Sequence, residues 1–392
     1  MRTIKNNLVP EALEKHLIEI YKHLHKHPEL SLEEHQTQNF IVEQLEKIGV
    51  PYKKMAGTGV CAEIKGDRAG KTVLLRCDMD ALPISEQTDL PYASTIDNVM
   101  HACGHDAHVT LGLGVATILN ENKHRLNGTL KIMFQPSEEV QPGGALPMIR
   151  EGILENPTVD IALGFHTNPF LLPGKFETKP GYMLANSDTV RIKIKGKGGH
   201  AAAPDQAIDA IAMAGQFLTD IQKIVSRQVS PLDPAVITFG HIVGGTTSNV
   251  ITDEVYLAGT VRTIKEETQT KIEQQMEQLL KSITTFWGGD YEYDFAKGHP
   301  ASWNDEEIVN QVMESATKCF ADDCFITLDN PYLSGDDFSR LASEVPAAFV
   351  YWGTGFSDRE NYPWHHPKYT LNLDSIKYGV TLATQSIYDI LT

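Results

Sequence analysis

The sequence predicts an α/β fold in which a mostly parallel sheet is flanked by helices and a smaller domain is inserted. Short apolar runs bounded by glycine alternate with amphipathic helix patterns, which is typical of a parallel sheet covered on both faces. A central stretch of about 110 residues instead follows the order strand-helix-strand-strand-helix-strand of a ferredoxin-like α+β unit. With 392 residues the chain is too long for one ordinary core. The expected bounds are residues 1–186 and 297–392 for the larger domain and 187–296 for the inserted one.

Two helices are expected first. Apolar residues recur at intervals of three and four between Pro10 and Lys26, which describes one face of a helix. Ser31 followed by Glu34 is a capping-box pattern that predicts the start of a second helix, which ends near Gly49. Histidines of this region that have no acidic or thiol partner at matching spacing are expected on the helix surfaces: His23, His25, His27 and His35.

The same patterns predict the remaining elements. In the larger domain, strands are expected at residues 59–64, 71–77, 129–134, 161–165 and 347–351, and helices at residues 108–120, 305–320 and 375–390. In the inserted domain, strands are expected at residues 189–195, 235–242, 254–261 and 291–295, and helices at residues 209–226 and 266–286. Sites in parallel sheets form where strands end, so the strand exits are where chemistry is expected.

The composition excludes several classes of partner. A formal net charge of −17 argues against nucleic acid or an anionic membrane surface as a partner, because the field of the protein would oppose both. No segment has the apolar core of a signal peptide or the length of a membrane span. An odd count of five cysteines in a large chain favours thiols in a reducing compartment over a disulfide framework. We therefore expect a cytoplasmic protein.

Side chains that could bind a metal are concentrated in residues 100–108. A thiol and three imidazoles lie within these nine residues, with Gly104 separating Cys103 from His105. This ligand density suits zinc, manganese or a similar divalent ion. The alternative is a histidine-rich solvated loop that leads into a helix.

Acidic residues and histidines recur at three strand exits. Asp78 and Asp80 point to the same face at the end of a strand, so one of them could orient a histidine ligand. Glu138 and Glu139 leave their strand in different directions, so one could bind metal while the other stays free as a base. His166 follows the next apolar run. The alternatives are solvated carboxylates and a buried, hydrogen-bonded core histidine.

Three further side chains come from irregular segments. Of the adjacent pair His365 and His366, at most one is expected to be a ligand, because neighbouring side chains of an extended chain cannot easily face one ion. In the inserted domain, glycine-rich turns precede His200 and Asn249. Such turns let the backbone approach a ligand closely, but they are equally ordinary hairpin turns.

Taken together, seven motifs resemble, in order and spacing, the amidohydrolase branch of the aminoacylase and glutamate-carboxypeptidase-like metallopeptidases. The resemblance covers nearly the whole chain. The motifs are Arg76-Cys-Asp-Met-Asp-Ala-Leu-Pro83, Met100-His-Ala-Cys-Gly-His-Asp-Ala-His108, Gln135-Pro-Ser-Glu-Glu139, Gly164-Phe-His166, Gly198-Gly-His-Ala-Ala-Ala-Pro204, Ser248-Asn-Val-Ile251 and Trp364-His-His-Pro367. Two departures are Ser137 and Cys77, where many relatives carry alanine.

The resemblance implies a zinc-peptidase-like catalytic domain with two divalent metal ions. The implied ligands are Cys103, His105, Glu139, His166 and His365. Glu138 would be the general base, and Asp80 is the aspartate that we expect to orient a ligand. Manganese or zinc is the expected metal, with cobalt or nickel as alternatives. The inserted domain would serve as a lid and form a homodimer, with His200 and Asn249 contacting the substrate or the transition state within one subunit or across the dimer.

The implied reaction is hydrolysis of an N-acyl amino acid to a carboxylic acid and a free amino acid. Two alternatives stay open. A dipeptidase or peptidase could use the same site, and a non-catalytic binding protein could keep the same fold. The sequence does not specify the acyl group or the amino acid.

Overall fold

A computed structural model describes residues 4–392 and divides the chain into two compact units. The first unit contains the described residues up to Met183, then Trp303–Asn330 and Asp337–Thr392. The second contains Leu184–Ser302 and Pro331–Asp336. Each unit has its own hydrophobic core.

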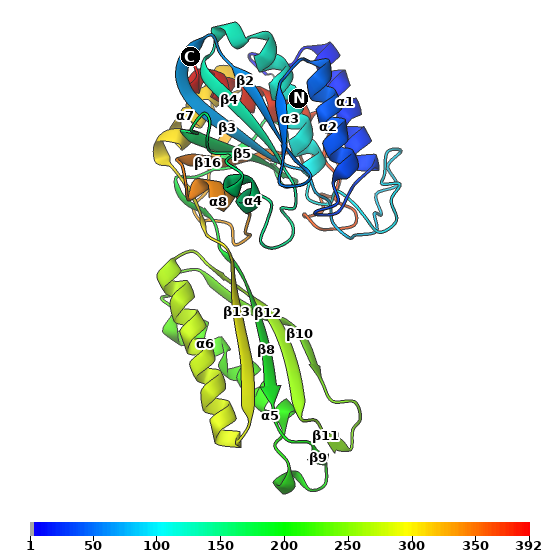
Figure 1. Cartoon of the computed structure of the whole chain (residues 1–392), viewed down its shortest axis with the longest axis vertical. Coiled ribbons are helices and arrows are strands. Elements are labelled where there is room, and N and C mark those ends of the chain that lie inside the picture. The colour runs from blue at the N-terminus through cyan, green and yellow to red at the C-terminus, as the bar shows by residue number, and fades with distance from the viewer. Residues whose placement is uncertain (1–3) are drawn as a thin grey trace. The chain divides into compact units, whose positions relative to one another are not determined.

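The first unit is built on a mostly parallel sheet, as predicted. Its strands are β1 (Tyr52–Met55), β2 (Gly59–Lys65), β3 (Arg68–Asp78), β4 (Asn127–Gln135), β5 (Ile161–Asn168), β6 (Phe176–Thr178), β15 (Phe325–Thr327) and β16 (Ala347–Gly353). They lie in the order β1-β2-β4-β3-β5-β16-β6-β15, of which Figure 1 labels β2, β4, β3, β5 and β16. The central strands β4, β3, β5 and β16 run parallel, whereas β1, β2 and β6 pair antiparallel with a neighbour. Strands β4, β5 and β16 are almost wholly buried, as is β3 from Thr72 onward, which explains their largely apolar sequences.

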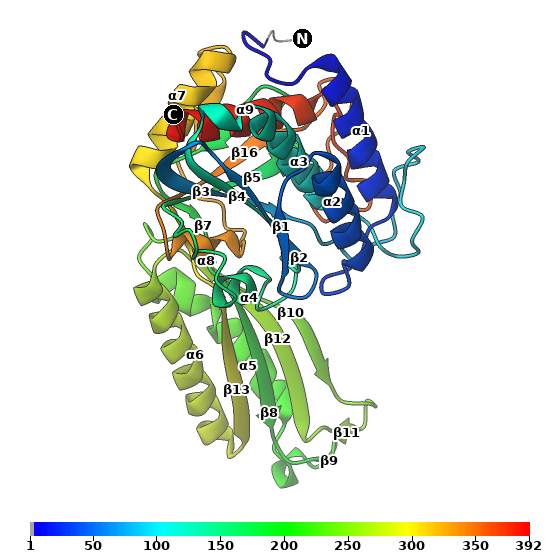
Figure 2. The same ribbon diagram turned by 45° about the horizontal axis from the view of Figure 1, so that its top comes forward.

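Helices cover both faces of this sheet (Figure 2). One face carries α1 (Glu11–Lys26), α2 (His35–Lys47), α3 (His105–Glu121), α7 (Glu306–Cys319) and α9 (Ser375–Ile390). The other carries the short helices α4 (Ala145–Arg150) and α8 (Phe338–Ala342). Two further strands, β7 (Gly181–Leu184) and β14 (Ser302–Asn304), form a separate pair. Within residues 4–392, no helix combines the length and the apolar character that a membrane span needs.

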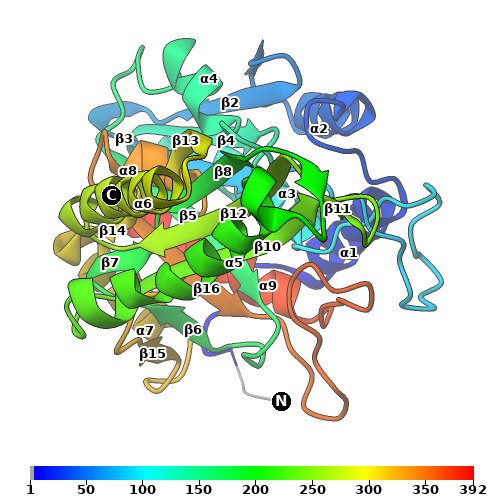
Figure 3. The same ribbon diagram turned by 90° about the horizontal axis from the view of Figure 1, so that it is seen from below.

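The second unit has the predicted ferredoxin-like arrangement. Its elements are β8 (Ser187–Lys195), α5 (Ala210–Asp220), β10 (Ala235–Gly244), β12 (Glu254–Thr263), α6 (Glu266–Trp287) and β13 (Asp290–His299). The strands form an antiparallel sheet in the order β10-β12-β8-β13, with both helices on one face (Figure 3). A small ribbon of β9 (Gly199–His200) and β11 (Val250–Ile251) completes the unit.

The expected bounds of two helices were wrong. Helix α5 ends at Asp220 rather than near residue 226, because a π-helical turn follows at Ile224–Gln228. The capping box expected at Ser31 does not form either, and α2 begins at His35 without a side-chain cap. The Ser31 hydroxyl instead donates to Asp80 Oδ2 over 2.6 Å.

Glu34 also has a partner far away in the sequence. Its carboxylate is buried and accepts from Thr58 Oγ1 (2.6 Å) and from the Ser137 backbone N–H (2.8 Å). The Ser137 hydroxyl in turn accepts from the Leu32 N–H over 2.8 Å. Ser137 therefore fixes the turn that leads into Glu138, a role that alanine at this position would fill only through its backbone N–H.

The expected surface position of His25 was wrong as well. The side chain is 1% exposed and lies between two carboxylates, with Nδ1 2.6 Å from Asp106 Oδ2 and Nε2 3.2 Å from Glu86 Oε1. Burial lowers the pKa of His25, but the hydrogen bonds and charges of Asp106 and Glu86 outweigh it and raise the pKa to about 9. Through its contact with Asp106, His25 thus anchors the first turn of α3.

Candidate active site

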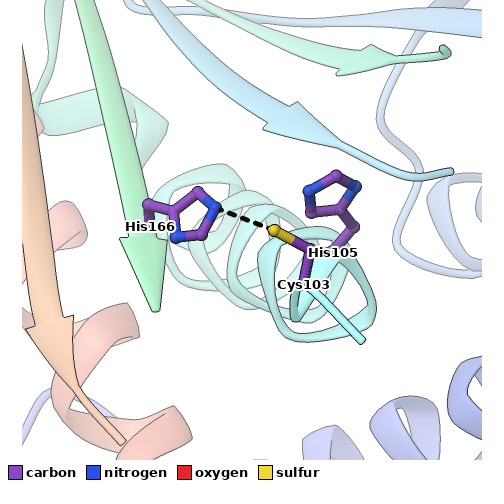
Figure 4. A group of neighbouring side chains, drawn as sticks. All are labelled: Cys103, His105 and His166. Carbon is purple, nitrogen blue, oxygen red and sulfur yellow. Dashed lines mark hydrogen bonds between the residues drawn. The ribbon is translucent and has the colours of Figure 1, made fainter. Parts of the chain in front are cut away.

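The predicted ligands of the first unit converge from four segments. Cys103 precedes α3 and His105 begins it, Glu139 follows β4, His166 lies on β5, and His365 lies between β16 and α9. The ligand atoms of Cys103, His105 and His166 lie within 4.8 Å of one another, and so do those of Cys103, Glu139 and His365. Figure 4 shows the Cys103 thiol and the His166 ring facing each other, with Sγ 3.5 Å from Nε2.

His105 is held with one ring nitrogen directed toward the cluster. Its Nδ1 donates toward the Asp80 carbonyl oxygen (2.9 Å) and Asp80 Oδ1 (3.2 Å). Its Nε2 lies 4.0 Å from Glu139 Oε1 and 3.5 Å from Asp78 Oδ2, and neither Nε2 nor Glu139 Oε1 forms a hydrogen bond among the described residues. Buried polar atoms without hydrogen bonds are costly, and a cation between them would remove that cost. These two atoms therefore fit a metal ion.

The charge around His105 also favours a cation. Burial lowers the pKa of His105, but the carboxylates of Asp78, Asp80 and Glu139 outweigh it and raise the pKa to about 10. The surplus of negative charge that favours a proton on this ring equally favours a divalent ion beside it.

His166, in contrast to His105, favours its neutral form. Burial, reinforced by His108, holds its pKa well below the usual range, so the ring is neutral. Its Nδ1 donates to the Thr167 carbonyl oxygen over 2.9 Å, which leaves the lone pair of Nε2 directed at Cys103. A neutral imidazole with one nitrogen bound to a carbonyl is the form in which histidine ligates metals.

Asp80 links the two glutamates to His105. Its Oδ1 accepts from the Glu138 N–H and its Oδ2 from the Glu139 N–H, each over 3.0 Å. Burial raises the pKa of Asp80, but the bonds to His105 and other donors lower it below the ordinary value. One buried carboxylate thus orients both the His105 ring and the turn that carries the glutamate pair.

His365 and His366 face different surroundings. His365 has a positive φ of 63°, and its Nε2 lies 3.2 Å from Glu139 Oε1. His366 instead stacks on Tyr362, with ring centroids 4.6 Å apart, and its Nδ1 accepts from the Lys368 N–H. The two adjacent side chains therefore have different partners, and of the pair His365 is the one beside Glu139.

His108, from the same histidine-rich stretch, uses both ring nitrogens for contacts with other residues. Its Nδ1 contacts Asp78 Oδ1, and its Nε2 accepts from the Thr167 N–H over 3.1 Å. With both nitrogens occupied, the ring serves as a structural bridge between β3 and β5.

His200 and Asn249 belong to the second unit, where they are neighbours. His200 pairs with Val250 in the β9–β11 ribbon, and the Ala201 N–H donates to the Asn249 carbonyl oxygen over 3.1 Å. Both side chains are exposed. Their roles toward a substrate stay predictions.

A buried ion network around Arg76, which the sequence did not predict, lies next to these residues. Arg76 is 1% exposed and donates to Asp78 Oδ2 (2.5 Å), Asp337 Oδ1 (2.8 Å) and Gln135 Oε1 (2.9 Å). Arg76 and Asp337 are 261 positions apart, so no local pattern could pair them. The sequence feature that could have indicated the network is the charged residue Arg76 within the apolar part of β3.

Comparisons with known proteins agree with this geometry. The profile of peptidase family M20/M25/M40 matches residues 74–389. An N-acetyl-L-cysteine deacetylase of Bacillus subtilis is 39% identical over 93% of this chain and 86% of its own length. Thermostable carboxypeptidase 1 of Saccharolobus solfataricus is 36% identical over 96% of this chain and 95% of its own.

A solved structure is similar over nearly its full length. It is a dinuclear metal-binding M20 peptidase of Bacillus subtilis, which superposes with a TM-score of 0.83 at 33% identity and covers 97% of this chain and 99% of that one. The match of the family profile, the identity to the curated relatives and the shared fold lead to one conclusion: this chain belongs to peptidase family M20/M25/M40, whose members hydrolyse amide bonds.

Proposed function

We propose that this hydrolase cleaves the amide bond of N-acyl amino acids and releases a carboxylic acid and a free amino acid. The observation that carries the proposal is a pair of buried atoms without a hydrogen bond, His105 Nε2 and Glu139 Oε1, among thiol and imidazole ligands and next to Glu138. Deacetylation of an N-acetyl amino acid by a relative supports the acyl amino acid as the substrate class.

Two divalent cations would be held by the predicted ligands Cys103, His105, Glu139, His166 and His365. Cys103 belongs to two of the possible ligand groups, one with His105 and His166 and one with Glu139 and His365. When bound, such cations polarise a scissile carbonyl and acidify water. The mixed thiolate, imidazole and carboxylate donors suit zinc or manganese, with cobalt or nickel as alternatives.

Glu138 is proposed as the general base. Its backbone is fixed by Asp80, and a side-chain oxygen lies within 4.8 Å of the ligand atoms of both His105 and Glu139. From this place the carboxylate can take a proton from the attacking water and deliver it to the leaving amine. Glu139, in contact with His365, is the better placed of the two to ligate.

The second unit is proposed to act as a lid and as the interface of a homodimer. Strand β10 is at the edge of its sheet, and Ile242 and Val243 near its end are each 55% exposed. An edge strand with exposed apolar residues can pair with a second copy. Light scattering should give a particle mass of twice the chain mass. Val243→Lys should lower this measured mass toward that of a single chain.

His200 and Asn249 would then contribute donors to the oxyanion that develops on the acyl carbonyl, within one subunit or across the dimer. The proposed location is the cytoplasm, which the odd count of five cysteines in the sequence supports.

The test is a substrate panel on the full chain with its metal content measured. Acetyl, benzoyl and aromatic-acyl amino acids are compared with free dipeptides, and release of the amino acid is followed. We expect faster release from acyl amino acids. Preference for dipeptides would favour the peptidase alternative, which the carboxypeptidase relative supports. No hydrolysis of either class with zinc, manganese, cobalt or nickel would overturn both.

A further inference from the structure

Thr167 follows the predicted ligand His166 on β5 and is fully buried. Its backbone and hydroxyl groups bond to every segment that carries an imidazole or thiol ligand. We propose that Thr167 is a positioning residue, which holds the segments of Cys103, His166 and His365 at the spacing that the metal centre needs. The inference rests on the proposed function, because it assigns a role toward the proposed metals.

The hydroxyl of Thr167 fixes the Cys103 segment. Thr167 Oγ1 donates to the Cys103 carbonyl oxygen over 3.1 Å. The next residue, Gly104, has a φ of 89°, and a Cβ there would lie only 2.6 Å from Thr167 Oγ1. The turn that presents Cys103 and starts α3 at His105 is therefore packed directly on this hydroxyl.

The His365 segment meets the same residue from the other side. Trp364 Nε1 donates to the Thr167 carbonyl oxygen over 3.1 Å, and Tyr369 Oη donates to Thr167 Oγ1 over 3.0 Å. The His365 N–H donates to the Ala102 carbonyl oxygen over 2.8 Å, which ties this segment to that of Cys103 as well. Residues 102–104 and 364–369 are thus joined directly by one backbone hydrogen bond and indirectly through Thr167.

The backbone of Thr167 orients His166 itself. Its carbonyl oxygen accepts from His166 Nδ1 (2.9 Å), and its N–H donates to His108 Nε2 (3.1 Å). The carbonyl therefore sets the His166 tautomer, while the bridge through His108 anchors this end of β5 to Asp78. These backbone bonds survive substitution, so the hydroxyl alone can be tested.

Thr167→Val keeps the shape of the side chain and removes both hydroxyl bonds, which leaves the Cys103 carbonyl and the Tyr369 hydroxyl without this partner. We expect zinc and manganese to bind the full-length variant about tenfold or more weakly, as for other residues that orient ligands. With cobalt as a probe, the thiolate-to-metal absorption band should lose intensity, since Cys103 is displaced. Thr167→Ser should restore affinity and band, because it keeps the hydroxyl.

Thr381→Val is the matched control. Thr381 is equally buried, on α9, and its hydroxyl has no hydrogen-bond partner among the described residues. It should change stability but leave metal affinity within about twofold. Should Thr167→Val fail to fold, Tyr369→Phe removes one of the two hydroxyl bonds and should still weaken metal binding and the cobalt band.

The outcomes separate this inference from the proposed function. If the wild-type protein binds no metal, the proposed function fails. If the wild type binds metal but Thr167→Val binds it with unchanged affinity and cobalt spectrum, only the role of Thr167 is overturned. Equal losses of metal affinity in Thr167→Val and Thr381→Val would also overturn it, since the effect would then be one of general stability.

Discussion

Glu138 and Glu139 are adjacent in the chain, but we propose different roles for them, base and metal ligand. Both N–H groups donate to Asp80, yet Glu139 contacts His365, while Glu138 keeps a carboxylate beside the cluster. Glu138→Gln removes the proposed proton acceptor and keeps the shape of the side chain. We expect turnover to fall by about 10²- to 10⁴-fold with metal content unchanged, measured by steady-state kinetics and elemental analysis. Exposed Glu33→Gln is the control, and a near-normal rate for Glu138→Gln would disprove the base role.

His25 predicts a pH dependence of stability. Its pKa rises from an ordinary value of 6.5 to about 9 on folding. A raised pKa adds stability that is fully present below pH 6.5 and is lost as the pH rises through 9. The free energy of unfolding of the wild type should therefore fall by a few kcal/mol between these pH values, because each tenfold gain in proton affinity on folding is worth about 1.4 kcal/mol.

Urea denaturation at several pH values measures this loss. His25→Gln should be less stable at pH 6.5 and show a flatter profile, since the His25 imidazolium no longer contributes to the titration. His16→Gln, an exposed histidine on the same helix, should behave as the wild type does. Parallel profiles for His25→Gln and the wild type would contradict the prediction.

At the scale of elements, the Arg76 network joins β3, the end of β4 and the segment that leads into α8. Arg76→Met would leave Asp78 and Asp337 as buried carboxylates without this cation. Removing one partner of a buried ion pair costs about 3–5 kcal/mol, so we expect a loss of that size in urea denaturation. Arg191→Met in the second unit removes an exposed ion pair with Asp294 and should cost less than about 1 kcal/mol. Equal small losses for both variants would show that the network is dispensable.

Local patterns at this scale predicted the elements with regular periodicity. The strands β2, β3, β4 and β16 begin and end within three residues of their expected bounds, and α9 matches its expected range. Short elements such as α4, α8 and β15 were not predicted, because three to six residues carry too little periodicity to stand out from a loop.

At the scale of the whole molecule, the two units have separate cores, and the predicted ligands lie in the first alone. A bound ligand stabilises the state that binds it, by about 2.7 kcal/mol at a hundredfold excess over its Kd. Chelation should therefore abolish activity and lower the melting temperature of the first unit, while the second unit melts as before. Calorimetry with and without chelator measures this, and added metal should restore both. Identical thermograms and full activity after chelation would contradict it.

The sequence by itself determined the α/β class, the ferredoxin-like insertion and the strand exits at which acids and histidines gather. These follow from periodicity and from the rule that parallel strands end at one edge of the sheet, both of which are local or topological. The resemblance added the ligand set and the roles of Glu138, His200 and Asn249, which stay predictions.

Only the tertiary structure decided the partners of buried polar groups. His25 was expected on a surface but lies between Asp106 and Glu86, and Arg76 pairs with Asp337 across 261 positions. Thr167 drew no attention in the sequence, yet it bonds to Cys103 and Tyr369. A buried polar group must be satisfied by whatever residue the fold brings within about 3 Å, and that proximity has no counterpart in the spacing of residues along the chain.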